Sequence, residues 1–133
     1  MIKISERVNL AIHALGYMAT YSGEEPFAVS HIAERMEVSP SHLAKVMQML
    51  VKSGFITSVR GAKGGFYFIA DPLNISLLNV YEAIDGPLMK QDCLLPSPMC
   101  KPGNCILNDV LTEATAFLSD NLSKKHISDF VFE

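Results

Sequence analysis

The most restrictive feature of the sequence is a helix start signal at Ser39-Pro40, followed closely by a glycine-rich hairpin signal. Ser39 can cap the first turn of a helix with its side chain. Pro40 suits the first helical position because proline has no N–H to leave unbonded there. The apolar spacing that follows predicts a helix over residues 41–52, which Ser53-Gly54 is expected to end.

Two short runs rich in β-branched and aromatic residues come next, at residues 55–59 and 66–69. Between them, residues 60–65 read Arg-Gly-Ala-Lys-Gly-Gly, a sequence that can turn tightly and that carries positive charge. Strand-like runs separated by such a turn predict an antiparallel hairpin. A helix-turn-helix followed by a basic hairpin is typical of a winged helix-turn-helix.

Charge is distributed unevenly along the chain. Residues 38–70 contain no Asp or Glu, although the whole chain has 14 acidic and 11 basic side chains. A basic segment on an acidic body suits an anionic partner such as DNA. On charge alone, a solvated surface without a partner is an equal alternative. The cationic residues of this segment are Lys45, Lys52, Arg60 and Lys63.

Apolar periodicity predicts further helices on both sides of this segment. Ser30 is expected to be the N-cap of one of them. The last helix has an apolar stripe wider than a monomer of 133 residues covers, so we expect one part in the core and one part in a dimer interface. Residues 126–132 are expected to pack back onto that helix. The predicted helices cover residues 5–21, 31–36, 75–84 and 106–122, and the stripe comprises Leu107, Val110, Leu111, Ala114, Phe117, Leu118 and Leu122.

These elements predict a mainly α protein with a small β-hairpin wing: a winged helix-turn-helix plus a long C-terminal dimerisation helix. We assign residues 1–72 to the winged helix-turn-helix DNA-binding region. We assign residues 73–133 to a cysteine loop and the dimerisation helix, the two regions together forming one compact domain.

Membrane insertion and catalysis are both disfavoured by the sequence. The longest stretch without a charged residue, residues 8–23, is too short and too polar for a bilayer span. We therefore expect a cytoplasmic protein. The sequence has no glycine-rich phosphate loop, paired carboxylates or nucleophile–base pair, so we do not expect an enzyme.

A helix fits the major groove of B-DNA, and a glycine-rich wing tip can approach the sugar-phosphate backbone closely. The first turn of the helix over residues 41–52 would then meet base edges, and Arg60 would enter the narrow minor groove. A winged helix that binds another protein is the alternative interpretation. The candidate DNA-binding residues are Ser39, Ser41, His42, Ala44, Lys45, Gln48, Arg60, Gly61, Lys63 and Gly64.

The chain has three cysteines, Cys93, Cys100 and Cys105, all on one loop bent by prolines and a glycine. An odd number of cysteines disfavours a disulfide framework. Three thiolates on one loop suit a metal or cluster that needs soft ligands. The spacing alone leaves zinc, unliganded thiols and a redox-sensing disulfide open, because it matches no zinc ribbon.

The segment Ser39-Pro40-Ser41-His42-Leu43-Ala44-Lys45-Val46, with Leu50, Gly54 and Ile84, resembles the Rrf-two family of bacterial transcription regulators. The most specific match is Val59-Arg60-Gly61-Ala62-Lys63-Gly64-Gly65 in the wing. The resemblance implies a homodimer on a pseudo-palindromic double-stranded operator, with the long C-terminal helix crossing between subunits. It also implies that Ser41, Ala44 and Lys45 approach bases while Arg60 enters the minor groove.

Three cysteines just before the long helix resemble the iron–sulfur branch of that family, which is IscR/NsrR-like. The resemblance implies a [2Fe-2S] or [4Fe-4S] cluster on Cys93, Cys100 and Cys105. Relatives supply a fourth ligand as histidine at the position of Asn108, or as an aspartate in the first helix of the other subunit, near the position of Asn9. Asparagine is a poor iron ligand, which leaves an exogenous ligand, an open iron position, or one of Glu6, Asp92 and Asp109.

The resulting hypothesis is a homodimeric repressor that senses nitric oxide, redox state or iron–sulfur status through this cluster. A cluster-free thiol-redox or cysteine-metabolism regulator of the same family is the alternative. A small iron–sulfur electron carrier, from another class, is disfavoured because it needs four cysteines per cluster and no basic wing.

Overall fold

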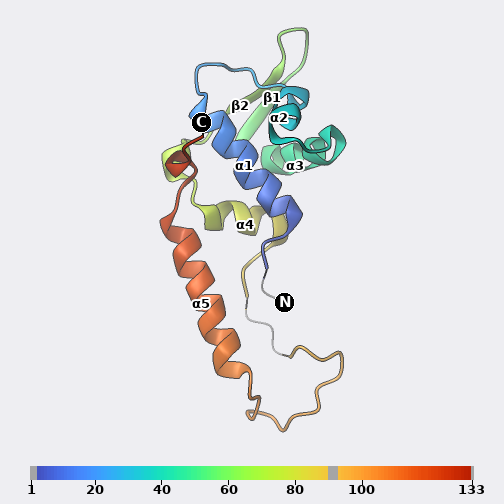
Figure 1. The fold of residues 1–133 in the computed structure, drawn as a ribbon, viewed down its shortest axis with the longest axis vertical. Helices are drawn as coiled ribbons and strands as arrows, with labels where there is room; N and C mark the ends of the chain where they lie inside the picture. The colour runs from blue at the N-terminus through green and yellow to red at the C-terminus, as the bar shows by residue number, and fades with distance from the viewer. Residues whose placement is uncertain (1–2, 90–92, 133) are drawn as a thin grey trace.

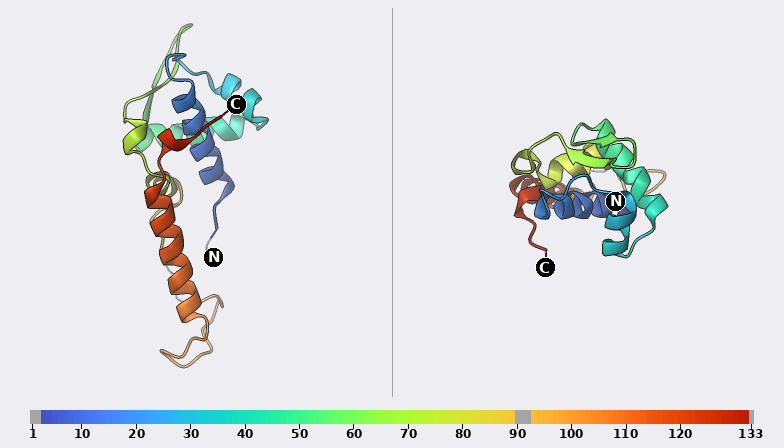
Figure 2. Two further views of the ribbon diagram at one scale, coloured as in Figure 1. Left: turned by 60° about the vertical axis from the view of Figure 1, so that its left-hand side comes forward. Right: turned by 90° about the horizontal axis from the view of Figure 1, so that it is seen from above.

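The computed structural model describes residues 3–89 and 93–132 and consists of a winged-helix body and a helical arm (Figure 1). The arm extends the molecule along one axis and ends in the cysteine loop, far from the wing (Figure 2). The elements in chain order are α1 (Glu6–Thr20), α2 (Val29–Met36), α3 (Pro40–Lys52), β1 (Ile56–Val59), β2 (Gly65–Phe68), η1 (Pro72–Asn74), α4 (Leu77–Asp85), α5 (Asn108–Lys124) and η2 (Ile127–Asp129).

The predicted start of the recognition helix is confirmed at α3. Ser39 is its N-cap and accepts a hydrogen bond from the His42 N–H at 3.4 Å, with Pro40 in the first helical position. The other end also follows the sequence, because Gly54 takes a positive φ of 83° just after the helix. Local chemistry alone therefore sets both ends of α3.

The predicted N-cap at Ser30 is wrong. α2 begins at Val29, with Ala28 in the N-cap position and in extended conformation. The reason lies just before it, where Phe27 pairs with Phe66: each N–H donates to the other residue's carbonyl, at 3.0 and 2.9 Å. This pairing holds the chain extended up to Ala28, so the helix starts earlier than the nearest serine.

The hairpin is confirmed, with β1 and β2 antiparallel and Val59 opposite Gly65. The Phe27 pairing fixes its base to the segment between α1 and α2. Gly65 is required there, because its φ is +152° and a Cβ would lie 2.8 Å from the Phe27 carbonyl oxygen. The wing is thus tied to the body at its root while its tip projects outward (Figure 1).

Helix α4 starts two residues later than the sequence predicted. Ser76 accepts from the Asn79 N–H at 3.0 Å, and the Asn79 side chain accepts from the Ser76 N–H at 2.9 Å. This reciprocal capping box fixes the start at Leu77. α5 similarly begins at Asn108, two residues after the predicted start.

The core is formed around α1, which packs against α3, α4 and η2. Burying each large apolar side chain contributes about 1.5–3 kcal/mol, so this cluster supplies most of the driving force for folding. Its fully buried large side chains include Leu15 and Met18 of α1, Leu43, Met47 and Leu50 of α3, and Ile127 of η2.

The prediction that residues 126–132 pack onto the long helix is wrong, because this segment packs against α1 instead. The Ile127 N–H donates to the Ile75 carbonyl at 2.9 Å, which brings the chain back to the body. Phe130 then covers Gly16, where a Cβ would meet the phenyl ring at 2.6 Å. The missing side chain at Gly16 leaves a notch that the ring fills.

We predict that Gly16→Ala lowers the free energy of unfolding by about 1–3 kcal/mol, because the added methyl overpacks against Phe130. Urea denaturation followed by circular dichroism measures the change. The control is the double variant Gly16→Ala/Phe130→Ala, compared with Phe130→Ala alone. Without the ring, the added methyl should not lower the stability further. Equal stability of Gly16→Ala and the unmodified chain would contradict the packing described here.

The apolar stripe of α5 divides into two faces. Leu111 and Leu118 are half-buried and Leu122 is buried, on the side that packs against α4. Val110 and Phe117, by contrast, are 59% and 69% exposed. Together with Leu107 and Ala114 they repeat at alternating intervals of three and four residues, the spacing of a helix–helix seam.

None of the helices in the described ranges, residues 3–89 and 93–132, combines the length and the apolar character that a membrane span requires.

Candidate nucleic-acid interface and cysteine loop

The solvent-facing side of α3 presents the polar residues predicted to meet DNA. Ser41, His42, Lys45 and Gln48 are exposed, and Ala44 is half-buried between them. The hydroxyls of Ser39 and Ser41 lie 2.9 Å apart, at the N-terminal end where the helix dipole is positive. The opposite side of α3 is buried in the core, so the helix is held rigidly while its polar side remains open.

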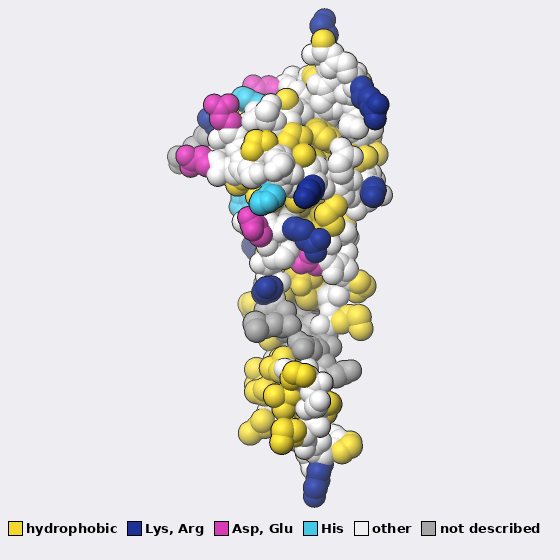
Figure 3. All heavy atoms as spheres, turned by 90° about the vertical axis from the view of Figure 1, so that its right-hand side faces the viewer, with side chains coloured by type: hydrophobic (Ala, Val, Ile, Leu, Met, Phe, Trp, Pro, Cys, Tyr) yellow, Lys and Arg dark blue, Asp and Glu magenta, His cyan; other side chains and the backbone are white. Residues whose placement is uncertain are grey.

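The wing tip is exposed from Arg60 to Lys63. The Gly64 N–H donates to the Gly61 carbonyl at 2.9 Å and closes the turn. A Cβ at Gly64 would clash with the Val59 carbonyl oxygen, so the turn needs glycine there. Figure 3 shows cationic side chains at the end of the wing and over the body below it. The arrangement can place positive charge on two elements against one polyanion.

The cysteine loop lies at the far end of α5, away from the winged helix of its own chain (Figures 1 and 2). All three cysteines line one hollow of about 250 Å³, where Cys100 is exposed and Cys93 and Cys105 are half-buried. The Leu95 N–H donates to the Cys93 sulfur at 3.4 Å. The loop therefore gathers the three cysteines at one place.

The donor chemistry of this hollow suits an iron–sulfur cluster, because cysteine thiolates are its usual ligands. Across residues 3–89 and 93–132, however, no three His, Cys, Asp or Glu side chains form a group ready to hold a metal ion. Of the proposed fourth ligands, Asp92 lies outside the described residues. Glu6 lines a different hollow, and the hollow formed by the cysteines is lined by neither Glu6 nor Asp109.

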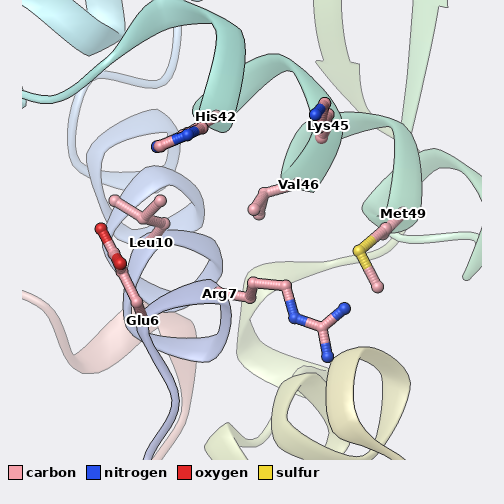
Figure 4. Close-up of a pocket in the computed structure, with 7 residues that line it drawn as sticks. All are labelled: Glu6, Arg7, Leu10, His42, Lys45, Val46 and Met49. Carbon is pink, nitrogen blue, oxygen red and sulfur yellow. The ribbon is translucent and has the colours of Figure 1, made fainter.

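A second hollow, of about 400 Å³, lies between the N-terminal half of α1 and α3 (Figure 4). Sequence analysis missed it, since its walls come from two helices whose crossing no local pattern reveals. Its lining residues are Glu6, Arg7 and Leu10 of α1 and His42, Lys45, Val46 and Met49 of α3.

Two contacts fasten the start of α1 to α4 beside this hollow. The Arg7 guanidinium lies 3.0 Å from the Asp85 carboxylate at the last residue of α4. The Tyr81 hydroxyl donates to the Lys3 carbonyl at 3.3 Å. Burial raises the pKa of Tyr81, and the negative charge of Asp85 raises it further. The tyrosine therefore stays a neutral donor at ordinary pH.

Comparison with known proteins gives a consistent result. A family model described as "Rrf2: Iron-dependent Transcriptional regulator" matches residues 4–133. The chain is 29% identical over 137 residues to the putative HTH-type transcriptional regulator YwgB of Bacillus subtilis, covering 99% of this chain and 88% of that protein. It is 28% identical over 123 residues to the HTH-type transcriptional regulator IscR of Vibrio vulnificus, covering 92% and 73% of the two chains.

Among solved structures, the fold is similar to that of CymR (YrzC), the global cysteine regulator of B. subtilis. The TM-score is 0.78 at 21% identity, and the match covers 97% of this chain and 95% of that chain. At this identity the similarity establishes the winged-helix fold alone. The predicted fold class, a winged helix-turn-helix with a long C-terminal helix, is thereby confirmed.

Proposed function

This chain belongs to the Rrf2 (Rrf-two) family of DNA-binding transcriptional regulators, which are not enzymes, and from that premise we propose that it is a homodimeric repressor controlled through its cysteine loop. It would bind a double-stranded operator in the cytoplasm. Residues 1–72 would contact DNA, and residues 73–133 would supply the sensor and the dimer interface. An electron carrier does not fit this family.

The observation that carries the proposal is the exposed basic surface on α3 and the wing. Lys45, Arg60 and Lys63 are exposed on it, and no acidic residue lies between Val38 and Ala70 to oppose DNA phosphates. The first turn of α3 would enter the major groove and Arg60 the minor groove. Phosphate contacts would position the protein, and base-edge contacts would give it specificity.

The sensor would be an iron–sulfur cluster held by Cys93, Cys100 and Cys105. Such a cluster, when bound, reacts with nitric oxide and oxidants and so supplies the sensing chemistry. The three cysteines line one hollow, which supports this assignment. The similarity to proteins named IscR supports it as well. Cluster nuclearity stays open.

Because the loop lies at the distal end of the arm, it would act on DNA binding through α5 and the partner subunit. An exposed apolar face on α5 supports such a dimer, since Val110 and Phe117 would lose their contact with water. A change at the loop would then alter the spacing of the two recognition helices by shifting the population of dimer conformations.

A specific observation favours a second candidate, a cluster-free thiol regulator. Within the described residues, Cys93, Cys100 and Cys105 do not form a group that could hold a metal ion as they stand. In that case oxidation of the exposed Cys100 would be the signal. Iron and sulfide content separates the two candidates.

We predict that Arg60→Ala and Lys45→Ala each weaken operator binding by about 1–3 kcal/mol without altering fold or dimer. The operator is first selected from a pool of random duplexes with the unmodified protein. Fluorescence anisotropy at one fixed salt concentration then gives the affinities, because phosphate contacts make them salt-dependent.

Lys124→Ala is the matched control, since Lys124 is an exposed lysine on α5, outside the proposed interface. It should bind the selected duplex like the unmodified chain. If both Arg60→Ala and Lys45→Ala bind the operator with unchanged affinity, α3 and the wing are excluded as the DNA-binding surface.

A further inference from the structure

The hollow between α1 and α3 combines an apolar floor with a charged rim. Leu10 and Val46 form the floor and are 5% and 2% exposed. Met49 closes one side and is half-buried. The volume of about 400 Å³ falls within the range of roughly 300–1,000 Å³ that is typical of small-molecule sites. The hollow can therefore accept an apolar body of moderate size.

Positive charge predominates on the α3 side of the rim. Lys45 and His42 stand there and are both exposed, as Figure 4 shows for the two labelled side chains above the floor. His42 belongs to the first turn of α3, at the positive end of the helix dipole, which favours an anion. These groups can receive a negative group at the mouth of the hollow.

The α1 side of the rim carries a net negative charge. Arg7 points toward α4, where its guanidinium pairs with Asp85 at 3.0 Å, so its charge is largely compensated (Figure 4). Glu6 carries the one carboxylate among the residues that line the hollow, and it lies in the first turn of α1. The negative group of a ligand would therefore be drawn to Lys45 and His42 rather than to α1.

We propose that this hollow binds a small organic anion with an apolar body, of the class of a medium-chain carboxylate. Leu10, Val46 and Met49 would contact the apolar body, and Lys45 with His42 would hold the carboxylate. The proposed operator contacts include the same two residues. A bound anion would thus compete with DNA and act as a second signal, independent of the cysteine loop.

Isothermal titration calorimetry of the full chain without DNA tests the site directly. The probes are octanoate and octanamide, which have the same apolar body but differ in charge. Octanoate is expected to bind once per chain, and octanamide about tenfold more weakly, because the charge-assisted contact is lost. Absence of saturable octanoate binding, or equal affinity for the two probes, would overturn the proposal.

Variants locate the site. Met49→Phe should fill the hollow and abolish octanoate binding, and Lys45→Gln should weaken it about tenfold. Lys52→Gln is the matched control, since it makes the same change at the last residue of α3, outside the hollow. Circular dichroism verifies the fold of each variant. Octanoate binding that persists in both Met49→Phe and Lys45→Gln would place the ligand elsewhere and refute the assignment.

The expected competition with DNA rests on the proposed function, whereas octanoate binding measured by calorimetry does not. These two predictions can therefore fail separately. Octanoate is expected to weaken operator binding by the unmodified chain and to leave Met49→Phe unaffected. If the unmodified chain binds octanoate but no DNA, the proposed function fails and the site stands. If octanoate binds without affecting operator affinity, the competitive role of the site is refuted.

Discussion

Anaerobically reconstituted protein is expected to contain one iron–sulfur cluster per chain, and each of Cys93→Ser, Cys100→Ser and Cys105→Ser is expected to abolish it. The reason is the donor set: three cysteines line one hollow at the end of α5. A serine hydroxyl stays protonated at neutral pH and is a far weaker iron ligand than a thiolate. Iron and sulfide assays, with the absorbance near 400 nm expected of such clusters, measure the loss.

Asn108→Ala is the control for the cluster prediction. Asn108 is the first residue of α5, and its N–H donates to the Cys105 carbonyl at 3.2 Å, a bond that alanine retains. Its amide side chain is not expected to bind iron, so the variant should retain its iron content. Zinc in place of iron, or a cluster that survives Cys100→Ser, would contradict the assignment of the three cysteines.

The second large effect is expected at the dimer seam of α5. Phe117→Glu should convert the dimer to a monomer at micromolar concentration, a loss of affinity of about a hundredfold or more, because it buries a charge in an apolar interface. Phe117 is 69% exposed in the single chain, so the monomer fold should tolerate the change. Light scattering or analytical ultracentrifugation gives the mass.

Thr112→Glu provides the matched control for that substitution. Thr112 is exposed on α5 and lies between Val110 and Ala114 in sequence, which places it off the face that they share. This variant should stay dimeric. A monomeric unmodified chain, or a Phe117→Glu variant that remains dimeric, would exclude the seam proposed here.

The winged-helix elements could be predicted from the sequence because local chemistry fixes them. The cap at Ser39, Pro40 in the first turn and Gly54 after the last turn are all short-range signals, and the structure confirms each. The hairpin follows for the same reason, since its turn needs the glycines that the sequence provides. The family model, which matches residues 4–133, agrees with the family that the wing motif resembles.

Two of the incorrect predictions involve partners distant in the sequence. The start of α2 depends on Phe27 pairing with Phe66, and the course of the C-terminal segment depends on Phe130 meeting Gly16. A single apolar stripe on α5 also could not reveal which residues face α4.

The candidate sites show the same contrast. The cysteine site could be predicted because the three cysteines stand out in the sequence by residue type. The basic surface could be predicted because its charge pattern is also visible in the sequence. The hollow between α1 and α3 could not be predicted, since Leu10 and Val46 individually look like ordinary core residues. The distance of the cysteine loop from its own winged helix was equally hidden, because it depends on the direction of α5 (Figure 1). The DNA-binding residues themselves stay predictions.

The central claim is that the cysteine loop controls DNA binding, and one titration tests it most directly. The selected operator duplex is titrated at fixed salt with cluster-loaded protein, cluster-free protein and Cys100→Ser. The account predicts that cluster-loaded and cluster-free protein differ in affinity by about 5- to 150-fold, the usual range of coupling between two sites, and that Cys100→Ser matches the cluster-free form. Equal affinities for all three would contradict it.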